Sequence, residues 1–478
     1  MVRSGYGRSL AAPFGEIPLG DYESTRRRHV EHMTARLPEH LDRLTWSADR
    51  LLAERNLRLR ELLKVARAHS SWHRDRLSTV DFDAIDEDRL RELPIMTKGD
   101  LMTHFDEIVT DRRLTLHRVN AHLGTLTSDA YLFDEFHALA SGGSSGVRGV
   151  FVWGWDAWAV CWLMNLRRQV SDALSDPDPN RGPPALMIVA AENPAHLSGA
   201  QGRTFADPAM QVHRFPVTLP LDAIVEGLNR VNGRTLMTYA SMAATLAAEA
   251  RAGRLTISPR RIITIAEPLL PEVRDAVQAA WGAPIANSWG TSEGGVVARG
   301  CYRGIGMHVS DDLLIIEPVD ENGKAVPCGS ESAKVYLTNL FNPLLPLIRY
   351  EITDQVTFLD EPCACGSAHR RIGDIQGRLD DVFTYPGGIV VHPHTFRSAL
   401  GRDAGVIEYQ VRQTPRGADV LLRARGPVDV EQLTRVLEAE LERVGCPQPL
   451  VTAKVIEEIP RVGVGKLKRF VPMAPSGR

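Results

Sequence analysis

Short apolar runs that alternate with helical segments in the middle of the chain constrain its fold more than any other feature. Strands that alternate with helices pair in parallel, because each helix carries the chain back across one face of the sheet. The pattern therefore predicts a parallel sheet flanked by helices. The strands are expected at 185–191, 235–241, 261–267 and 284–290, with an alanine-rich helix at Met242–Arg251 between the second and the third.

The segments on either side of this region are of different kinds. Leucines at helical spacing predict one amphipathic helix from Leu41 to Ala68. After about residue 300 the apolar runs are separated by turn residues, which predicts a more antiparallel, barrel-like β subdomain. Its strands are expected at 313–319, 334–340 and 355–360.

A last unit begins near residue 377 and is long enough for a small α+β domain. It contains a strand pattern at 419–425 and a helix at 429–444, where Asp429 suits the N-cap and Gly445 the end. We therefore expect an α/β protein with a large N-terminal α/β domain and a small C-terminal α+β domain. A length of 478 residues agrees with this division, because single hydrophobic cores stop growing well below that size.

Composition and charge exclude several classes of protein. The formal net charge is −3, with 56 basic and 59 acidic residues, which argues against a protein that coats nucleic acid. No apolar run reaches the roughly 18 residues of a membrane span, and the first residues lack the apolar core of a secretory signal. Six cysteines spread over so long a chain are typical of a reducing compartment. We expect a cytoplasmic protein that acts on small molecules, with no nucleic-acid or membrane partner.

A stretch rich in glycine and serine, residues 141–149, is either a phosphate-binding loop or a plain linker. It lacks the lysine of a Walker A motif. Consecutive small residues nevertheless leave backbone N–H groups uncovered for an anion, Ser141, Ser144 and Ser145 add hydroxyl donors, and Arg148 adds a positive charge. Taken alone, the composition favours the linker.

Three other segments place a charged residue where a predicted strand or loop ends. Glu293 follows an apolar strand and can hold Mg²⁺, which prefers oxygen ligands, while Trp289 offers a flat face to a base. Asp354 can accept two hydrogen bonds from a ribose diol. Lys466 lies on a glycine-flanked loop and can present a point charge to phosphate. Taken singly, each of these residues is more commonly an exposed turn or tail residue.

In their order along the chain, these segments resemble the motifs of the adenylate-forming (AMP-forming) ligase superfamily, and its phenylacetate–CoA ligase-like branch in particular. Five motifs in one order are far more specific than any single motif. Ala266-Glu267-Pro268 also resembles the strand end beside the adenine in this family, and LPIMTKGDL at 93–101 resembles its N-terminal region. The five matching stretches are GGSSGVR (142–148), WGTSE (289–293), YEITD (350–354), GRLDD (377–381) and PRVGVGK (460–466).

The resemblance implies an ATP-dependent enzyme that works in two half-reactions. A carboxylate attacks the α-phosphorus of ATP, which releases pyrophosphate and leaves an acyl-adenylate; a second nucleophile, commonly the thiol of CoA, then displaces AMP. Such catalysis rests on positioning and charge stabilisation. The resemblance also implies an adenylation core at residues 1–378, which binds ATP and the acid, and a mobile domain at 379–478, which carries the catalytic lysine and rotates between the half-reactions.

The same resemblance assigns roles to individual residues. Lys466 would bridge the attacking carboxylate and the α-phosphate, Glu293 would act beside it by binding Mg²⁺, and Asp380 would be the hinge. Asp354 would hold the ribose, and Arg378 would stay near the nucleotide. The other nucleotide-binding residues are expected to be Ser141, Gly142, Gly143, Ser144, Ser145, Gly146, Arg148, Ala266, Glu267, Pro268, Trp289, Gly290, Thr291 and Ser292.

The acid is expected to bind among the ends of the predicted parallel strands. By analogy with the branch, an aromatic acid fits best. One of Trp153, Trp155 and Trp158 is a candidate to face it, although core packing suits at least two of them. The expected pocket residues are His196, Tyr239, Ala240 and Ser288.

The acceptor of the acyl group stays open at this point. CoA is the first expectation; the alternatives are a carrier-protein thiol, an amine, or adenylation of an unusual oxyanion in a biosynthetic pathway. A third hypothesis is a protein that binds a nucleotide without turnover. The presence of Glu293, Asp354 and Lys466 argues against it. Assembly as a homodimer also stays open.

Three cysteines and a histidine form a further candidate site. Cys301, His308, Cys363 and Cys365 make a Cys₃His set, which structural zinc prefers. Because Cys-x-Cys is a looser signal than Cys-x-x-Cys, the residues alone leave zinc and free thiols equally open. The branch has a similar pattern, which implies a structural Zn²⁺ that clips two loops together.

Three positions depart from the family pattern. Trp289 replaces the usual tyrosine and is still expected to stack on adenine. Arg148 replaces a proline and is expected to supply charge to the phosphates. Glu351 stands where the family often has arginine, which leaves its effect open.

Overall fold

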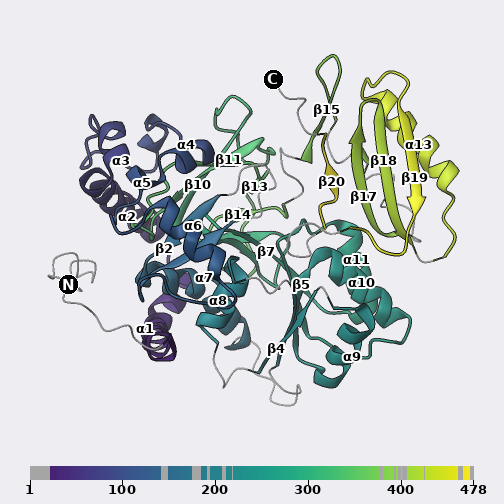
Figure 1. Cartoon of the computed structure of the whole chain (residues 1–478), viewed down its shortest axis with the longest axis horizontal. Helices are drawn as coiled ribbons and strands as arrows, with labels where there is room; N and C mark the ends of the chain where they lie inside the picture. Colours follow the sequence, from purple (N-terminus) through teal and green to yellow (C-terminus); the bar gives the residue numbers. More distant parts are fainter. Residues whose placement is uncertain are drawn as a thin grey trace.

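The computed structural model describes residues 22–141, 149–174, 185–190, 194–206, 211–217, 219–375, 381–391, 395–396, 400, 406–424, 426–460 and 467–473. In these ranges no helix combines the length and the apolar character that a membrane crossing requires. The N-terminal helices lie at one side of a central sheet, and a separate C-terminal sheet lies at the opposite side (Figure 1).

The central sheet has nine strands and joins a parallel part to an antiparallel part. The predicted parallel strands are confirmed, and their apolar sequences fit because helices or further layers cover both faces. In spatial order the parallel strands are β4 (Val212–Pro216), β3 (Leu186–Ala190), β5 (Thr235–Tyr239), β6 (Arg261–Ile265) and β7 (Ile285–Thr291). The antiparallel strands that follow are β8 (Gly295–Gly300), β9 (Met307–Val309), β14 (Arg371–Ile372) and β13 (Phe358–Leu359).

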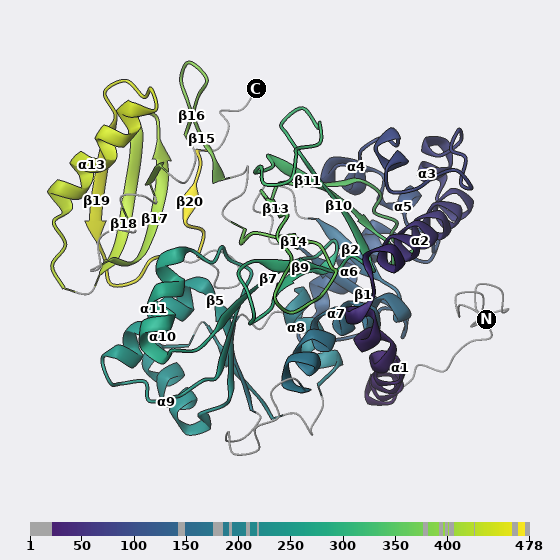
Figure 2. The ribbon, with the colours of Figure 1, turned by 180° about the vertical axis from the view of Figure 1, so that it is seen from behind.

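Helices cover the parallel strands on both faces. Helices α9 (Leu221–Val231), α10 (Ala240–Arg251) and α11 (Pro271–Trp281) pack on one face, where they form a core with Met187, Val189, Leu236 and Ile262. Helices α7 (Trp155–Leu174) and α8 (Leu197–Thr204) lie over the other face. Figure 2 shows α10 and α11 between β5 and the C-terminal sheet.

The N-terminal region is helical, but the single helix predicted from Leu41 to Ala68 is wrong. Helix α1 (Tyr22–Asp42) ends in a 3₁₀ turn, η2 (Arg43–Thr45), and α2 (Ala48–His69) begins after it. The break occurs at Ser47, which has extended backbone and whose hydroxyl accepts a hydrogen bond from the N–H of Arg50 at 3.3 Å. Shorter helical elements follow: α3 (Ser71–Arg76), η3 (Arg89–Glu92), α4 (Lys98–Thr103), α5 (Phe105–Ile108) and α6 (Leu116–Thr125).

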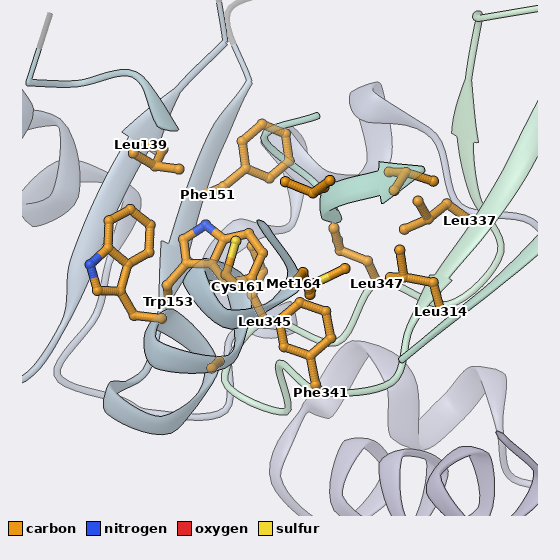
Figure 3. Close-up of a cluster of buried hydrophobic side chains, with 14 of the residues drawn as sticks. Leu139, Phe151, Trp153, Cys161, Met164, Leu314, Leu337, Phe341, Leu345 and Leu347 are labelled. Atoms are coloured by element: carbon orange, nitrogen blue, oxygen red, sulfur yellow. The ribbon is translucent and has the colours of Figure 1, made fainter. Parts of the chain in front are cut away.

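The antiparallel subdomain predicted after residue 300 contains a three-stranded sheet, β10 (Leu314–Val319), β11 (Lys334–Asn339) and β12 (Tyr350–Ile352). The predicted strand at 355–360 does not join this sheet, because β13 pairs at the edge of the central sheet instead. Side chains of α7 and of the hairpin β1 (His137–Ala140) and β2 (Val150–Trp153) pack against this subdomain (Figure 3). The labelled side chains of that core are Leu139, Phe151, Trp153, Cys161, Met164, Leu314, Leu337, Phe341, Leu345 and Leu347.

The C-terminal unit has a sheet and a hydrophobic core of its own. Helix α13 (Val430–Arg443) packs on the sheet, and its N-cap is Asp429 as predicted, because the Asp429 carboxylate accepts from the N–H of Gln432 at 2.9 Å. The boundary predicted at 378/379 lies outside the described residues. The sheet order is β19 (Leu450–Val455), β18 (Gly417–Ala424), β17 (Val406–Thr414) and β20 (Phe470–Val471), and a hairpin of β15 (Phe383–Tyr385) and β16 (Ile389–Val391) lies beside it.

Candidate active site

A cavity of about 490 Å³ lies on the face of the central sheet opposite α9–α11. Because successive side chains of a strand point to opposite faces, alternate residues of the parallel strands form its floor. Trp162, Asn165 and Gln169 of α7 cover it from one helix face, at the spacing i, i+3, i+7. The floor consists of Leu186, Ile188 and Ala190 of β3, Met237 and Tyr239 of β5, Ile263 and Ile265 of β6, and Ser288 and Gly290 of β7.

Two groups of predicted site residues line this one cavity. His196, Tyr239 and Ser288, predicted for the acid pocket, all face it, and Ala240 is the first residue of α10 directly after Tyr239. Ala266, Gly290, Thr291 and Ser292, predicted for the nucleotide, lie where β6 and β7 end. The carboxyl ends of parallel strands are where open α/β sheets bind ligands.

Sequence reasoning missed the residues that cover the cavity. Trp162 lines it, whereas Trp153 and Trp158 are fully buried in the core and Trp155 stacks on His29 with ring centroids 3.9 Å apart. The helical spacing of Trp162, Asn165 and Gln169 was a usable signal, but it is the same signal that core packing gives. The other missed lining residues include Gln201, Phe205 and Arg214.

The predicted adenine segment, Ala266 to Pro268, begins with an uncommon backbone conformation. Ala266 has φ +61°, in the left-handed region that costs a residue with a Cβ free energy, and it lines the cavity. Glu267, the next residue, is buried, and within the described residues its carboxylate accepts two hydrogen bonds: Oε2 from the N–H of Ser241 at 2.8 Å, and Oε1 from the N–H of Leu467 at 3.1 Å. Ala266 thus lies between Ile265, whose side chain faces the cavity, and Glu267, whose side chain contacts the C-terminal segment.

Trp289 and Asp354 contact each other directly. The indole Nε1 of Trp289 donates to Oδ2 of Asp354 at 3.1 Å, and the two side chains are only 6% and 4% exposed, respectively. Neither is among the described residues that line the cavity. Trp289 lies on the face of β7 opposite Ser288 and Gly290, and its stacking on adenine stays a prediction.

Glu293 and Glu351 lie near one buried tyrosine. Burial, and after it the charges of Glu293 and Glu351, raise the pKa of Tyr350 above its usual value. Glu293 is half-buried, and its backbone carbonyl accepts from the side-chain amide of Asn339 at 2.9 Å. Glu351 forms an ion pair with Lys334 at 2.7 Å, so a basic partner accompanies the acid at this position.

The ends of the glycine- and serine-rich stretch are joined. Ser141 donates its N–H to the carbonyl of Gly149 at 2.9 Å, and its hydroxyl accepts from the N–H of Gly149 at 2.8 Å. These two hydrogen bonds continue the pairing of hairpin β1–β2 to its open end. Several predicted residues lie outside the described part of the chain: Gly142, Gly143, Ser144, Ser145, Gly146, Arg148, Arg378, Asp380 and Lys466.

Cys301, His308, Cys363 and Cys365 form a compact cluster, with one ligand atom from each residue within 4.8 Å of the others. Cys301 Sγ lies 3.3 Å from Cys363 Sγ, and Cys365 Sγ lies 3.4 Å from His308 Nε2. The other ring nitrogen of His308, Nδ1, is 3.2 Å from the carbonyl of His369. This leaves Nε2 for a metal, because a ligating histidine usually donates its second N–H to a carbonyl or carboxylate. The donor set and its spacing fit a tetrahedral zinc ion.

Comparison with known proteins gives one relative by sequence. No known protein-family signature matches the chain. A phenylacetate-coenzyme A ligase of Thermus thermophilus is 30% identical over 228 residues, which cover 45% of this chain and 48% of that enzyme. The chain therefore spans about half the length of the curated relative that it matches.

Solved structures confirm the predicted fold. A 2-hydroxyisobutyryl-CoA ligase in its post-adenylation state, in complex with R3-HIB-AMP, has a TM-score of 0.70 at 18% identity, covering 90% of this chain and 91% of that chain. The same ligase with 2-HIB-AMP and CoA in its thioesterification state has a TM-score of 0.57 at 19% identity, with the same coverage. The sequence relative and these structural neighbours are all acid–CoA ligases, and the chain has their α/β fold over nine-tenths of its length.

Proposed function

We propose that the protein is an AMP-forming ligase, which uses ATP to activate a carboxylic acid as an acyl-adenylate and then transfers the acyl group to CoA. The observation that carries the proposal is that residues predicted for the acid and residues predicted for the nucleotide line one cavity together. The order of the motifs, the fold and the matched acid–CoA ligases support the same reaction.

The proposed roles divide the chemistry between the two parts of the chain. Lys466 neutralises charge between the attacking carboxylate and the α-phosphate, and Glu293 holds Mg²⁺ on the phosphates. Asp354 holds the ribose, and Arg378 stays near the nucleotide. Residues 142–146 hold the β- and γ-phosphates, which leave as pyrophosphate. In such a site, fixed charges and oriented N–H groups lower the barrier because they need no rearrangement as the reaction proceeds.

We propose a mainly apolar, aromatic acid as the substrate. The cavity walls combine aliphatic side chains of the sheet with the rings of Trp162 and Phe205, and polar side chains such as Asn165 and Gln201 lie among them. Its volume of about 490 Å³ falls in the range of small-molecule sites. We assign the reaction to the cytoplasm, because six cysteines spread over so long a chain are typical of a reducing compartment.

An acid-dependent ATP–pyrophosphate exchange assay over a panel of aromatic and aliphatic acids tests the proposal. At least one acid is expected to support exchange, and addition of CoA is expected to give a thioester detectable by mass spectrometry. Exchange without a thioester would favour a carrier-protein thiol or an amine as the acceptor. Absence of exchange with every acid would contradict adenylation itself.

Two neighbouring residues of β6 allow a matched test of the acid pocket. Both belong to the hydrophobic core beside α9–α11, but Ile263 also lines the cavity and Ile262 does not. Ile263→Phe is expected to lower kcat/KM for a bulky aromatic acid by about tenfold or more, because small size changes in such pockets are worth about 1–3 kcal/mol. KM for ATP should change little. The measurement is exchange kinetics with large and small acids.

The control is the same substitution one residue earlier. Ile262→Phe overpacks the core and is expected to lower the free energy of unfolding by about 1–3 kcal/mol, without altering the preference among acids. If Ile263→Phe leaves the preference unchanged, or if Ile262→Phe alters it, the acid does not bind in this cavity.

We also propose that the Cys₃His cluster binds a structural zinc ion. Zinc would hold the β8–β9 connection, which contains Cys301, to the segment with Cys363 and Cys365. With four protein ligands the site has no open position, so zinc would contribute stability and not activate a water.

Metal analysis tests the zinc proposal. Protein purified without chelators is expected to contain about one equivalent of zinc per chain, as four protein ligands fill one site. Cys365→Ser should lower both the zinc content and the melting temperature, whereas Cys328→Ser, at an exposed cysteine outside the cluster, should change neither. Well below one equivalent in the parent protein would refute the proposal.

A further inference from the structure

Glu267 joins the cavity-bearing part of the chain to the C-terminal segment. Its two carboxylate oxygens each accept one backbone N–H, from Ser241 and from Leu467, and these residues come from opposite sides of the interface. We call this pair of hydrogen bonds the Glu267 bridge. Leu467 is 5% exposed and follows Lys466 directly in the sequence.

Glu267 lies beside the first turn of α10, a position that favours a carboxylate. Ser241 is the second residue of α10, and the first N–H groups of a helix have no partner within the helix. A carboxylate there also lies at the positive end of the helix dipole. The N–H of Ser241 therefore holds one carboxylate oxygen of Glu267, and the other oxygen is directed to the segment that begins at Leu467.

Further contacts beside the bridge connect the same two parts of the chain. Arg423 of β18 donates to the hydroxyl of Thr245 in α10 and pairs with Glu408 of β17 at 2.9 Å. Arg469 is 8% exposed, and its guanidinium lies 4.9 Å from the ring centre of Tyr409. Burial opposes the charge of Arg469, but Tyr409 and the carboxylates of Glu267 and Glu408 raise its pKa above the usual value. The Glu267 bridge thus belongs to a charged and hydroxyl-lined interface.

Building on the proposed function, we infer that Glu267 is a positioning residue that fixes the C-terminal unit for the adenylation half-reaction and releases it for acyl transfer. The closer superposition on the post-adenylation state of 2-hydroxyisobutyryl-CoA ligase than on its thioesterification state supports this arrangement. The bridge acts one residue away from Lys466 in sequence, so its loss should impair the step that needs the lysine.

Glu267→Gln tests the inference with little change in shape. Glutamine has one acceptor oxygen, whereas the bridge must accept two N–H groups, so one bond is lost. The turnover number of acid-dependent ATP–pyrophosphate exchange is expected to fall at least about tenfold, the equivalent of roughly 1.4 kcal/mol. KM for ATP should stay within about threefold, and thioester formation from supplied acyl-adenylate and CoA within about twofold.

Two further variants distinguish a positioning role of Glu267 from a role in folding or in nucleotide binding. Glu226→Gln makes the same chemical change at an exposed position of α9 and should leave both half-reactions unchanged. Thr245→Val removes the acceptor of Arg423 at the same interface and should slow exchange alone, which keeps the inference testable if Glu267→Gln does not fold. A parallel loss in both half-reactions, or a rise in KM for ATP alone, would assign Glu267 to folding or nucleotide binding and overturn the inference.

Hydrogen–deuterium exchange tests the bridge without any activity. The amide of Leu467 should exchange at least tenfold faster in Glu267→Gln than in the parent protein or in Glu226→Gln, because its acceptor is weakened or lost. Unchanged exchange at Leu467 would overturn the inference even if the protein is a ligase. Faster exchange in a protein without pyrophosphate exchange would retain the bridge and refute only the proposed function.

Discussion

Lys466→Ala is expected to slow acid-dependent ATP–pyrophosphate exchange by about 10²–10³-fold, the typical cost of removing one preorganised group that stabilises developing charge. Thioester formation from supplied acyl-adenylate and CoA should remain close to that of the parent protein, because the proposed role of the lysine is confined to the first half-reaction. Rates of both half-reactions, measured with the same enzyme preparation, check the result.

Lys468→Ala is the matched control for this variant. Lys468 lies two residues further along the same segment, and its backbone carbonyl, which the substitution keeps, accepts from the side-chain amide of Gln410 at 2.8 Å. Exchange in the control should stay within about twofold, since Lys468 has no proposed contact with the reacting carboxylate or the α-phosphate, and transition-state stabilisation of this kind needs a group aimed at the developing charge. Equal losses in the two variants would indicate a general effect of positive charge, and no loss in Lys466→Ala would contradict the assigned role.

Arg167→Ala is expected to lower the free energy of unfolding by about 3–5 kcal/mol, because it leaves a buried carboxylate without its main partner. Arg167 donates two hydrogen bonds to Asp312, at 2.7 and 2.8 Å, and the residues are 2% and 0% exposed, respectively. Urea denaturation of the parent and variant proteins measures the difference. Arg230→Ala, which breaks an exposed pair with Glu226, should cost at most about 0.5 kcal/mol.

The Arg167–Asp312 pair also predicts how the free energy of unfolding depends on pH. Burial opposes the charge of Asp312, but Arg167 holds its pKa well below the usual value. A carboxyl group with a lowered pKa in the folded state contributes stability above its unfolded pKa of about 3.9, and this stability is lost as the pH falls below that value. The parent protein should therefore exceed Arg167→Ala in stability at pH 7, and the difference should shrink below about pH 4. A constant difference down to acid pH would contradict this account.

The parallel strands were predictable because local pattern and burial agree there. An apolar run as short as 185–191 favours a covered strand over a helix, and the helices that cover it lie next to it in sequence. The prediction of one helix through Ser47 was wrong because two local signals disagree there. The leucine spacing continues on both sides of Ser47, and the competing N-cap occupies a single residue.

Part of the candidate site could be predicted from the sequence, because the ends of the parallel strands, where ligands bind, could be located in it. His196, Tyr239, Ser288 and Thr291 were expected near one another, and all line the cavity. The helical cover was missed because an apolar residue that faces a ligand has the same periodicity as one that faces the core. The bridge from Glu267 to Leu467 joins residues 200 positions apart through a backbone N–H, for which no side-chain pattern exists.

The alternation of side chains along the parallel strands also affects which substitutions can change the acid that such an enzyme accepts. On β3, Leu186, Ile188 and Ala190 face the cavity, while Met187 and Val189 pack under the helices. The positions that shape the cavity are therefore interleaved with positions that serve packing alone. Because Ile188 and Ala190 also belong to the buried core, exchanges that keep their volume would change the accepted acid at the smallest cost in stability.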